Sequence, residues 1–204
     1  MSILSKLSFK DQAFRLREDA ILDATTRILA VKGFDLMTID DIAAEVGISK
    51  PSLYKHFKSK EELVGAVMTR LIDEAGAQLA SLDAGLSALQ QLQALLEWAL
   101  RVRLGGGLPF LPSTSAHVRE MLMKNLLYVG KVIKLNSQLE KRVRQAKAAG
   151  ELRADLPDDV ILFSYYARSC DPTVEYLRLY SKMGDEDIVR YMLDVSFQGM
   201  LATK

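Results

Sequence analysis

Apolar residues recur at helical spacing along almost the whole chain. Alternating strand patterns of Val, Ile and Thr are scarce. The i, i+3, i+7, i+8 spacing of a helix face occurs in Ile21, Ala24, Ile28 and Leu29. Lys32-Gly33 is the predicted end of this helix, because glycine tolerates the left-handed conformation of a C-cap. The sequence therefore predicts an all-α fold.

Capping residues mark the next helix starts. Thr38 precedes IDDIAAEV and is its predicted cap, and Gly47 ends that short helix. Ser59, followed three residues later by Glu62, predicts a capping box for a helix that runs to about Leu82. Two short helices are therefore expected before a long one.

Helical spacing continues in the rest of the chain. A helical stretch is predicted over 116–149, with a break near Asn125 and a stop at Gly150. A further stretch begins near residue 158 and is expected to kink at Pro172. Asp185 is the predicted cap of the last amphipathic helix.

The segment TIDDIAAEV, GI, SKPSLYKHF consists of two predicted helices joined by a tight turn. Gly47 makes the turn, and Ala43 is small where the helices must cross closely. The expected inward positions are apolar: Ile42, Val46, Ile48 and Leu53. This pattern predicts a helix-turn-helix, whose second helix enters the major groove of DNA.

A cationic block covers the second of these helices. Residues 49–60 contain four lysines and His56 but no acid, whereas the whole chain has a net charge of only +1. A lysine run is usually a solvated helix face. Here it accompanies a turn signature and hydroxyl groups at the helix start, so a local attraction to DNA is favoured.

The candidate contacts divide by their position on the second helix. Lys50 and Ser52 lie at its start, where side chains meet base edges, and Pro51 offers an apolar surface to a thymine methyl group. Residues further along are expected to contact phosphates, which position the protein on the duplex. The full predicted DNA-binding set is Thr38, Ser49, Lys50, Pro51, Ser52, Tyr54, Lys55, His56 and Lys60.

Residues 21–68, about a quarter of the chain, resemble the DNA-binding region of the tetracycline-repressor (TetR) family. The resemblance lies in Lys32-Gly33-Phe34, Thr38, Ile42-Ala43, Gly47-Ile48-Ser49, the Leu53-Tyr54-x-His56-Phe57 run and Ser59-Lys60-Glu61. It implies a dimeric, ligand-released transcriptional repressor. It also places Thr38, Lys50, Ser52, Tyr54, His56 and Lys60 at the family's DNA-contact positions. Pro51 stands where the family often has glycine or another small residue.

The resemblance implies three parts: an N-terminal arm over 1–14, a helix-turn-helix domain over 15–60, and a helical effector-binding and dimerisation domain over 61–204. The arm is either loose or in contact with a partner. An effector pocket among the middle helices would suit a hydrophobic or aromatic small molecule. The expected ligand-binding residues are Trp98, Arg101, Phe110, His117, Met121, Tyr128, Tyr165 and Tyr166, with Arg168 as a further polar candidate.

Large apolar side chains are also typical of plain core, and this alternative applies to the aromatic and methionine positions of the middle helices, Phe163 included. In the last two helices they are candidates for burial between two subunits, and Gly199 permits close approach. The resemblance implies a four-helix interface there. The predicted homodimer contacts are Tyr176, Leu177, Tyr180, Met192, Val195, Phe197 and Met200.

The sequence does not favour an enzyme. It has one cysteine and two histidines, so no nucleophile–base pair is visible, and no metal-ligand spacing occurs. The glycines of LGGGLPFLPS lack the strand and the Gly-Lys-Ser/Thr of a phosphate loop. We therefore expect no catalytic residue, metal or cofactor. The alternative function is an effector-independent nucleoid or architectural DNA-binding protein of the same fold.

The expected location is the cytoplasm. A single cysteine, Cys170, allows no internal disulfide, and no apolar run is long enough to span a bilayer. The segment at the N-terminus is interrupted by charges and lacks the apolar stretch of a signal peptide. We therefore expect no membrane partner.

Overall fold

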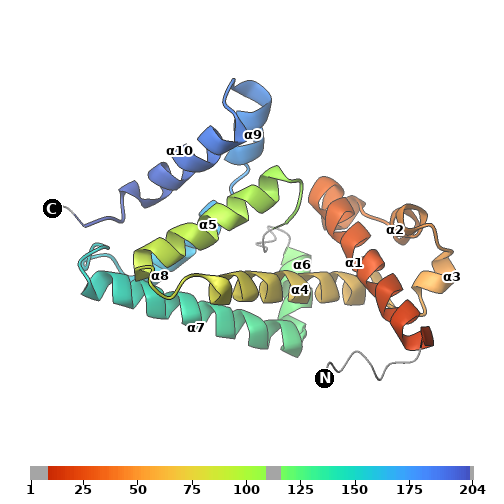
Figure 1. The fold of residues 1–204 in the computed structure, drawn as a ribbon. Coiled ribbons are helices and arrows are strands. Elements are labelled where there is room, and N and C mark those ends of the chain that lie inside the picture. Colours follow the sequence, from red (N-terminus) through yellow and green to blue (C-terminus); the bar gives the residue numbers. More distant parts are fainter. Residues whose placement is uncertain (1–8, 109–115, 203–204) are drawn as a thin grey trace. The chain divides into compact units, whose positions relative to one another are not determined.

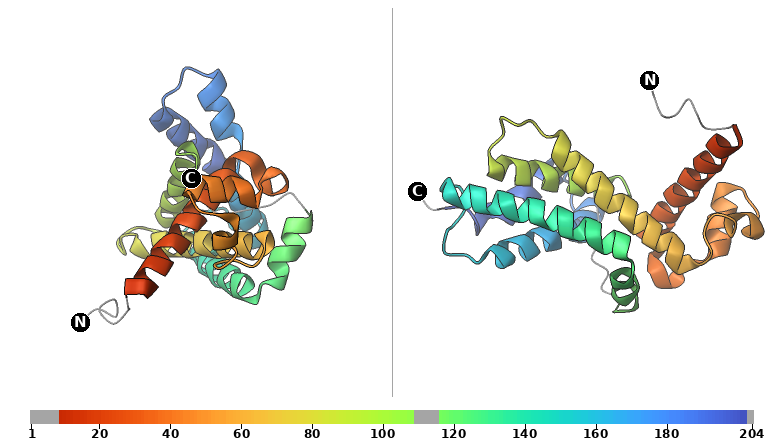
Figure 2. Two further views of the ribbon diagram at one scale, coloured as in Figure 1. Left: turned by 90° about the vertical axis from the view of Figure 1, so that its right-hand side faces the viewer. Right: turned by 90° about the horizontal axis from the view of Figure 1, so that it is seen from below.

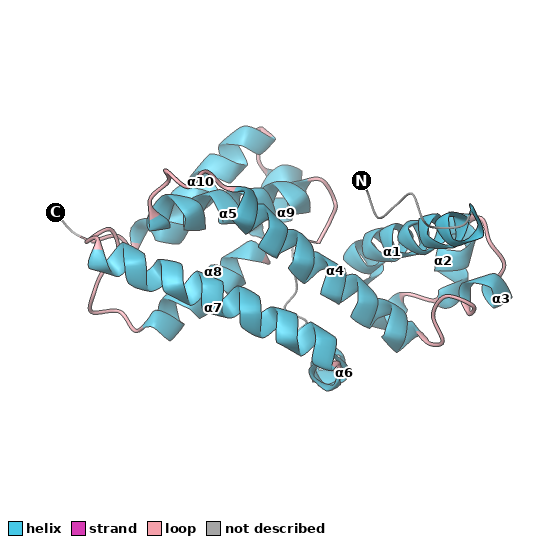
Figure 3. Ribbon diagram, turned by 60° about the horizontal axis from the view of Figure 1, so that its bottom comes forward, coloured by secondary structure: helices cyan, strands magenta, loops and turns pink. Residues whose placement is uncertain are grey.

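The structure, a computed structural model, describes residues 9–108 and 116–202, and these residues form ten α-helices without a β-strand (Figures 1 and 3). The predicted all-α class is confirmed. The chain divides into two compact units, Met1–Val67 and Met68–Lys204. None of the helices described is long and apolar enough to cross a membrane.

The first unit contains α1 (Phe9–Leu36), α2 (Ile39–Val46) and α3 (Lys50–Leu53). α1 includes residues 9–14 of the predicted N-terminal arm. Residues 1–8 of that arm lie outside the described residues. Gly33 has φ 69° and interrupts the helical backbone of α1, as its role as a C-cap predicts. A further helical turn follows it, to Leu36.

The core of the first unit forms where the apolar face of α1 meets the two short helices. Its buried side chains come mostly from positions that the helical spacing marks as inward. They include Ile21, Ile28, Leu29, Ile42, Leu53 and Phe57. Val46 and Ile48, predicted to be inward, are only half-buried. The first unit therefore fixes the short helices through few large side chains, of which Leu53 is one.

α4 (Lys60–Ser81) begins after a cap that matches the predicted capping box in part. The Glu62 amide donates to the Ser59 hydroxyl at 3.1 Å, as a capping box requires. The Glu62 carboxylate accepts from the Lys58 amide at 2.7 Å, one residue earlier than the predicted partner. This cap fixes the direction in which the chain leaves the cationic block.

The second unit contains the later part of α4 together with α5 (Ala88–Leu104), α6 (Ala116–Lys124), α7 (Leu126–Ala148), α8 (Asp158–Ser169), α9 (Thr173–Tyr180) and α10 (Asp185–Gln198) (Figure 2). The predicted break falls at Asn125, whose side chain caps α7. Pro172 separates α8 from α9 instead of kinking one helix. Asp185 was wrongly predicted as a cap: Gly184 is the N-cap, and Asp185 is the first helical residue.

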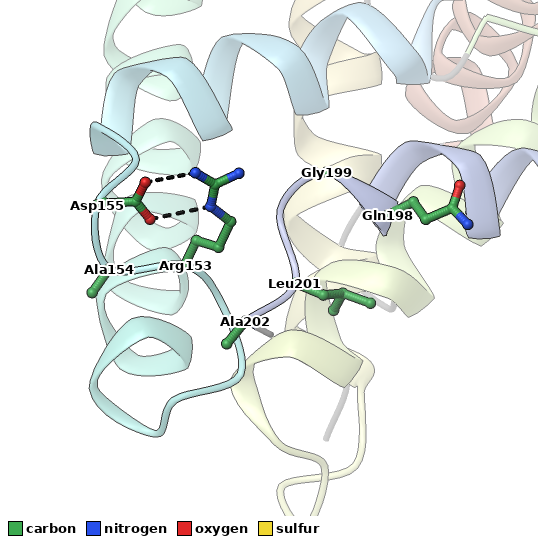
Figure 4. A pocket seen from close by; sticks show the side chains of 7 residues that line it. All are labelled: Arg153, Ala154, Asp155, Gln198, Gly199, Leu201 and Ala202. Atoms are coloured by element: carbon green, nitrogen blue, oxygen red, sulfur yellow. Dashed lines mark hydrogen bonds and ion pairs between the residues drawn. The ribbon is translucent and has the colours of Figure 1, made fainter. Parts of the chain in front are cut away.

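The chain segment after α10 is tied to the turn between α7 and α8. Leu152 and Leu201 form an isolated antiparallel bridge, and the Arg153 amide donates to the Met200 carbonyl at 2.9 Å. Beside this bridge lies a groove of about 480 Å³, where Arg153 pairs with Asp155 at 2.6 Å (Figure 4). These bonds fix the end of α10 within the second unit.

Candidate nucleic-acid interface

The turn between α2 and α3 has the geometry that its sequence predicts. The Thr38 hydroxyl accepts from the Asp41 amide at 3.1 Å, and the Asp41 carboxylate accepts from the Thr38 amide at 3.0 Å, which completes a capping box. Gly47 is left-handed at φ 73°, and its amide donates back to α2. A side chain at Gly47 would strain this turn, so the glycine sets the angle at which α3 leaves α2.

α3 itself is shorter than predicted. Ser49 caps it, its hydroxyl accepting from the Ser52 amide at 3.3 Å, and Pro51 lies in the first turn. Regular helix ends at Leu53, but backbone bonds continue as turns, with the Phe57 amide donating to the Leu53 carbonyl at 3.1 Å. The recognition element is thus one helical turn extended by further turns as far as Phe57.

The side chains of this element divide into a buried side and an open side. Leu53 and Phe57 are 0% and 4% exposed and anchor the element in the core. Ser52, His56 and Lys60 are half-buried. The remaining predicted DNA-binding residues are exposed: Thr38, Ser49, Lys50, Pro51, Tyr54 and Lys55. The structure therefore places the exposed predicted residues on the open side of the recognition element and, for Thr38, at the start of α2.

Two acids of α2 form ion pairs with lysines, one of which belongs to the cationic block. Lys50 Nζ lies 2.9 Å from Asp40 Oδ2, and this hydrogen bond raises the pKa of Lys50. Lys32 Nζ lies 2.9 Å from Asp41 Oδ1 and, together with the Thr38 cap, lowers the pKa of Asp41 to about 2. Lys50 is thus paired within the protein before any DNA arrives, a contact that the sequence does not reveal.

His56 and Lys60 each lie against an aromatic ring. The His56 ring stacks on Phe14 of α1, with centroids 4.0 Å apart, and its Nδ1 is buried without a hydrogen-bond partner among the described residues. Burial lowers the pKa of His56. Lys60 Nζ lies 4.3 Å from the centroid of Phe34. These contacts orient two predicted phosphate ligands, and the role of Phe14 is missed by the sequence.

Three of the predicted ligand-binding residues are tyrosines of neighbouring helices in the second unit. Tyr128, Tyr165 and Tyr166 lie among α7 and α8, and burial raises the pKa of each. The Tyr165 hydroxyl donates to the Leu92 carbonyl at 3.0 Å, and that of Tyr166 donates to Asn136 at 3.2 Å. These three tyrosines, the tyrosine cluster, have the contacts of a packed core.

The other described ligand-binding predictions are less buried than Tyr128 and Tyr165. Arg101 pairs with Glu186 of α10 at 2.6 Å and with Glu97 at 2.8 Å, and Glu186 makes the larger contribution to its raised pKa. Trp98 and Met121 are half-buried, and His117 is exposed. Arg168 pairs with Asp171. Phe110 lies outside the described residues.

The predicted dimer residues differ in how far they are exposed. Tyr176 and Tyr180 are exposed and stack with centroids 6.4 Å apart, and Val195 is 58% exposed. Leu177 and Met200 are half-buried. Met192 and Phe197 are 6% and 3% exposed, so they belong to the core of their own protomer. Phe163, a predicted core position, is instead 67% exposed.

The arrangement of α2, the glycine turn and α3 defines a helix-turn-helix protein. Residues 21–67 match the family model of bacterial regulatory proteins, tetR family. The HTH-type transcriptional repressor KstR2 of Mycolicibacterium smegmatis is 38% identical over 80 residues, which cover 39% of each chain. YerO of Bacillus subtilis is 48% identical over 48 residues, 24% of this chain and 17% of that one. The chain therefore matches well under half the length of these relatives.

The likeness of fold extends much further. A TetR family transcription regulator from Marinobacter aquaeolei has a TM-score of 0.68 at 18% identity, covering 95% of this chain and all of that one. AibR, in a structure with isovaleryl coenzyme A and operator DNA, has a TM-score of 0.64 at 21% identity, covering 88% and 97%. The match at residues 21–67 confirms the resemblance of this region to the TetR family.

No enzyme family is indicated by these comparisons, in which the relatives are transcriptional regulators. Among the described residues, no group of three His, Cys, Asp or Glu side chains is placed to hold a metal ion.

Proposed function

We propose that the protein regulates transcription as a homodimer that binds a palindromic operator and, as a repressor, is released by a small hydrophobic ligand. The observation that carries the proposal is the open side of the recognition element, where Lys50 and Pro51 stand exposed over the buried Leu53. KstR2, a relative in sequence, is named a repressor. AibR, a relative in fold, has been solved with operator DNA and a coenzyme A thioester. Both relatives support the proposal of a repressor that binds an operator and a ligand.

The proposed contacts have separate roles. Lys50 and Ser52 read base edges, and Pro51 contacts a thymine methyl group. Thr38, Ser49, Tyr54, Lys55, His56 and Lys60 hold the phosphates on either side. His56 contributes a hydrogen bond from a ring held against Phe14, and burial favours its neutral form. Lys60 contributes charge from the first turn of α4.

Lys50→Ala and Lys60→Ala are expected to weaken DNA binding in different ways. Loss of one phosphate contact at Lys60 lowers the slope of log K against log salt by about 0.9 on every duplex. Loss of Lys50 also reduces discrimination at one base pair, by about 5- to 150-fold. Fluorescence anisotropy over a salt series, on operator and scrambled duplexes, measures both effects. Lys141→Ala, an exposed lysine of α7, is the control. Unchanged binding in both variants contradicts the proposed interface.

Asp40→Asn is expected to strengthen DNA binding. Lys50 must leave Asp40 before it reaches a base, and Asp40 itself repels phosphate. Because the pair is exposed to solvent, the gain is modest, about two- to fivefold at low salt. The same titrations measure it, with Asp19→Asn of α1 as an acid-to-amide control. Weaker binding in Asp40→Asn would mean that the acid positions Lys50 for DNA.

The proposed release uses coupling between ligand and DNA. Linkage requires that the ligand weaken DNA binding by the same factor by which DNA weakens ligand binding, typically about 5- to 150-fold. α4 is the proposed lever, because it begins at Lys60 and continues into the second unit. The alternative, an effector-independent architectural protein, predicts equal affinity for any duplex and no change on adding ligands. A screen for operator release separates the two.

A further inference from the structure

A groove of about 440 Å³ lies between α4 and α7, which run side by side in the second unit (Figure 3). It is separate from the tyrosine cluster, none of whose members lines it. Its volume lies within the range of small-molecule sites. The lining residues are Ile72, Asp73, Gly76, Ala77, Ala80, Lys131, Lys134, Leu135 and Gln138.

The floor of this α4–α7 groove is apolar, and polar side chains lie at its edge. Ile72 and Leu135 are 7% and 3% exposed and form its floor. Beyond Ile72 and Asp73, the α4 side consists of glycine and two alanines, residues that elsewhere let helices approach closely. Here the space stays open, because a Cβ built on Gly76 meets no atom within 4 Å. The groove therefore has room for an apolar chain along α4.

The charges at the groove's edge favour one negative group. Lys131 pairs with Asp73, so these two side chains neutralise each other. Lys134 is exposed, and no ion pair to it is found within the described part of the chain. The lining set thus contains two lysines and one acid, which leaves one positive charge. A single compact ammonium suits a carboxylate better than it suits a group that needs a bidentate partner.

We infer that the α4–α7 groove binds an amphipathic carboxylate with a hydrocarbon chain. The carboxylate pairs with Lys134, and the chain lies on Ile72 and Leu135 against Gly76. The chain supplies most of the affinity through burial of apolar surface, and the lysine sets the orientation. This assignment names a ligand class and a place for the effector proposed above. Binding in the groove does not depend on the proposed function, whereas an effect of this ligand on DNA binding does.

Calorimetric titration of the full chain with decanoate, 1-decanol and hexanoate tests the ligand class. Decanoate is expected to bind with saturation, 1-decanol roughly fivefold more weakly for want of the ion pair, and hexanoate more weakly for want of apolar area. Absence of saturable decanoate binding overturns the inference. Equal affinity for decanoate and 1-decanol overturns the role of Lys134.

Two variants locate the site. Gly76→Leu fills the groove and should abolish decanoate binding without unfolding α4, since leucine favours helix over glycine. Gly130→Leu of α7 is the matched control, because its added Cβ also meets no atom within 4 Å but it does not line the groove. Binding retained in Gly76→Leu, or lost equally in Gly130→Leu, overturns the assignment.

Charge reversal supplies an independent test. Lys134→Glu should weaken decanoate roughly fivefold or more and leave 1-decanol unchanged. Lys141→Glu, two turns along α7 and outside the groove, should change neither. An equal loss of decanoate affinity in both variants contradicts the assignment of the ligand to the groove. Operator release by decanoate is measured separately. Release that is lost in Gly76→Leu supports the groove as the effector site, whereas binding without release supports the groove and contradicts the effector role.

Discussion

A Val195→Asp variant is expected to be monomeric and to lose operator binding, although the recognition element is unchanged. Val195 is 58% exposed on α10, and the proposed twofold interface would bury it. A carboxylate there would be desolvated without a partner, once in each subunit. Two linked half-site contacts exceed one by about 10²- to 10⁴-fold through effective concentration, and the variant loses that factor.

Light scattering and anisotropy on two duplexes measure the outcome. The variant should bind a single half-site as the wild type binds it, because the half-site needs one recognition element. Ile133→Asp of α7, 63% exposed, is the control for placing a carboxylate on an exposed helix. Phe197 is unsuitable for this experiment, since it is 3% exposed and a charge there would disrupt the protomer core. A stable monomer of the wild-type chain that binds a palindrome tightly would contradict the dimer.

Local rules explain why much of the first unit could be predicted. Caps and turns depend on neighbours in sequence: Thr38 with Asp41 at the start of α2, and Gly47 in a left-handed turn. Apolar spacing also identified Leu53 as buried. The resemblance to the TetR family depends on the same short stretch, which is why it could be recognised from residues 21–68.

Contacts between residues far apart in sequence could not be predicted in this way. Phe14 stacks on His56, and Lys50 pairs with Asp40, although no spacing rule joins these residues. Helix faces presented a second difficulty. α10 has apolar residues on more than one side, so the sequence did not distinguish buried Phe197 from exposed Val195. The α4–α7 groove depends on the separation of two helices, which side-chain periodicity does not encode.

The second large effect is expected from Leu53→Ala in the recognition element. Leu53 is 0% exposed and is the buried anchor of a helix only four residues long. Replacing a buried leucine with alanine costs about 2–5 kcal/mol, through lost transfer free energy and the cavity left behind. A unit of fewer than 70 residues has little stability to spare. The first unit should therefore unfold locally, and DNA binding should fall for every sequence.

Hydrogen exchange read by peptide distinguishes this result from a lost DNA contact. Leu53→Ala should remove amide protection from α2 and α3 and leave α7 and α8 protected, because their buried residues belong to the second unit. Leu36→Ala makes the same chemical change at a leucine 74% exposed, where surface substitutions usually stay within about 0.5 kcal/mol. Equal protection in the two variants would mean that Leu53 does not anchor the element. The open side of α3 would then need another support to present Lys50 to DNA.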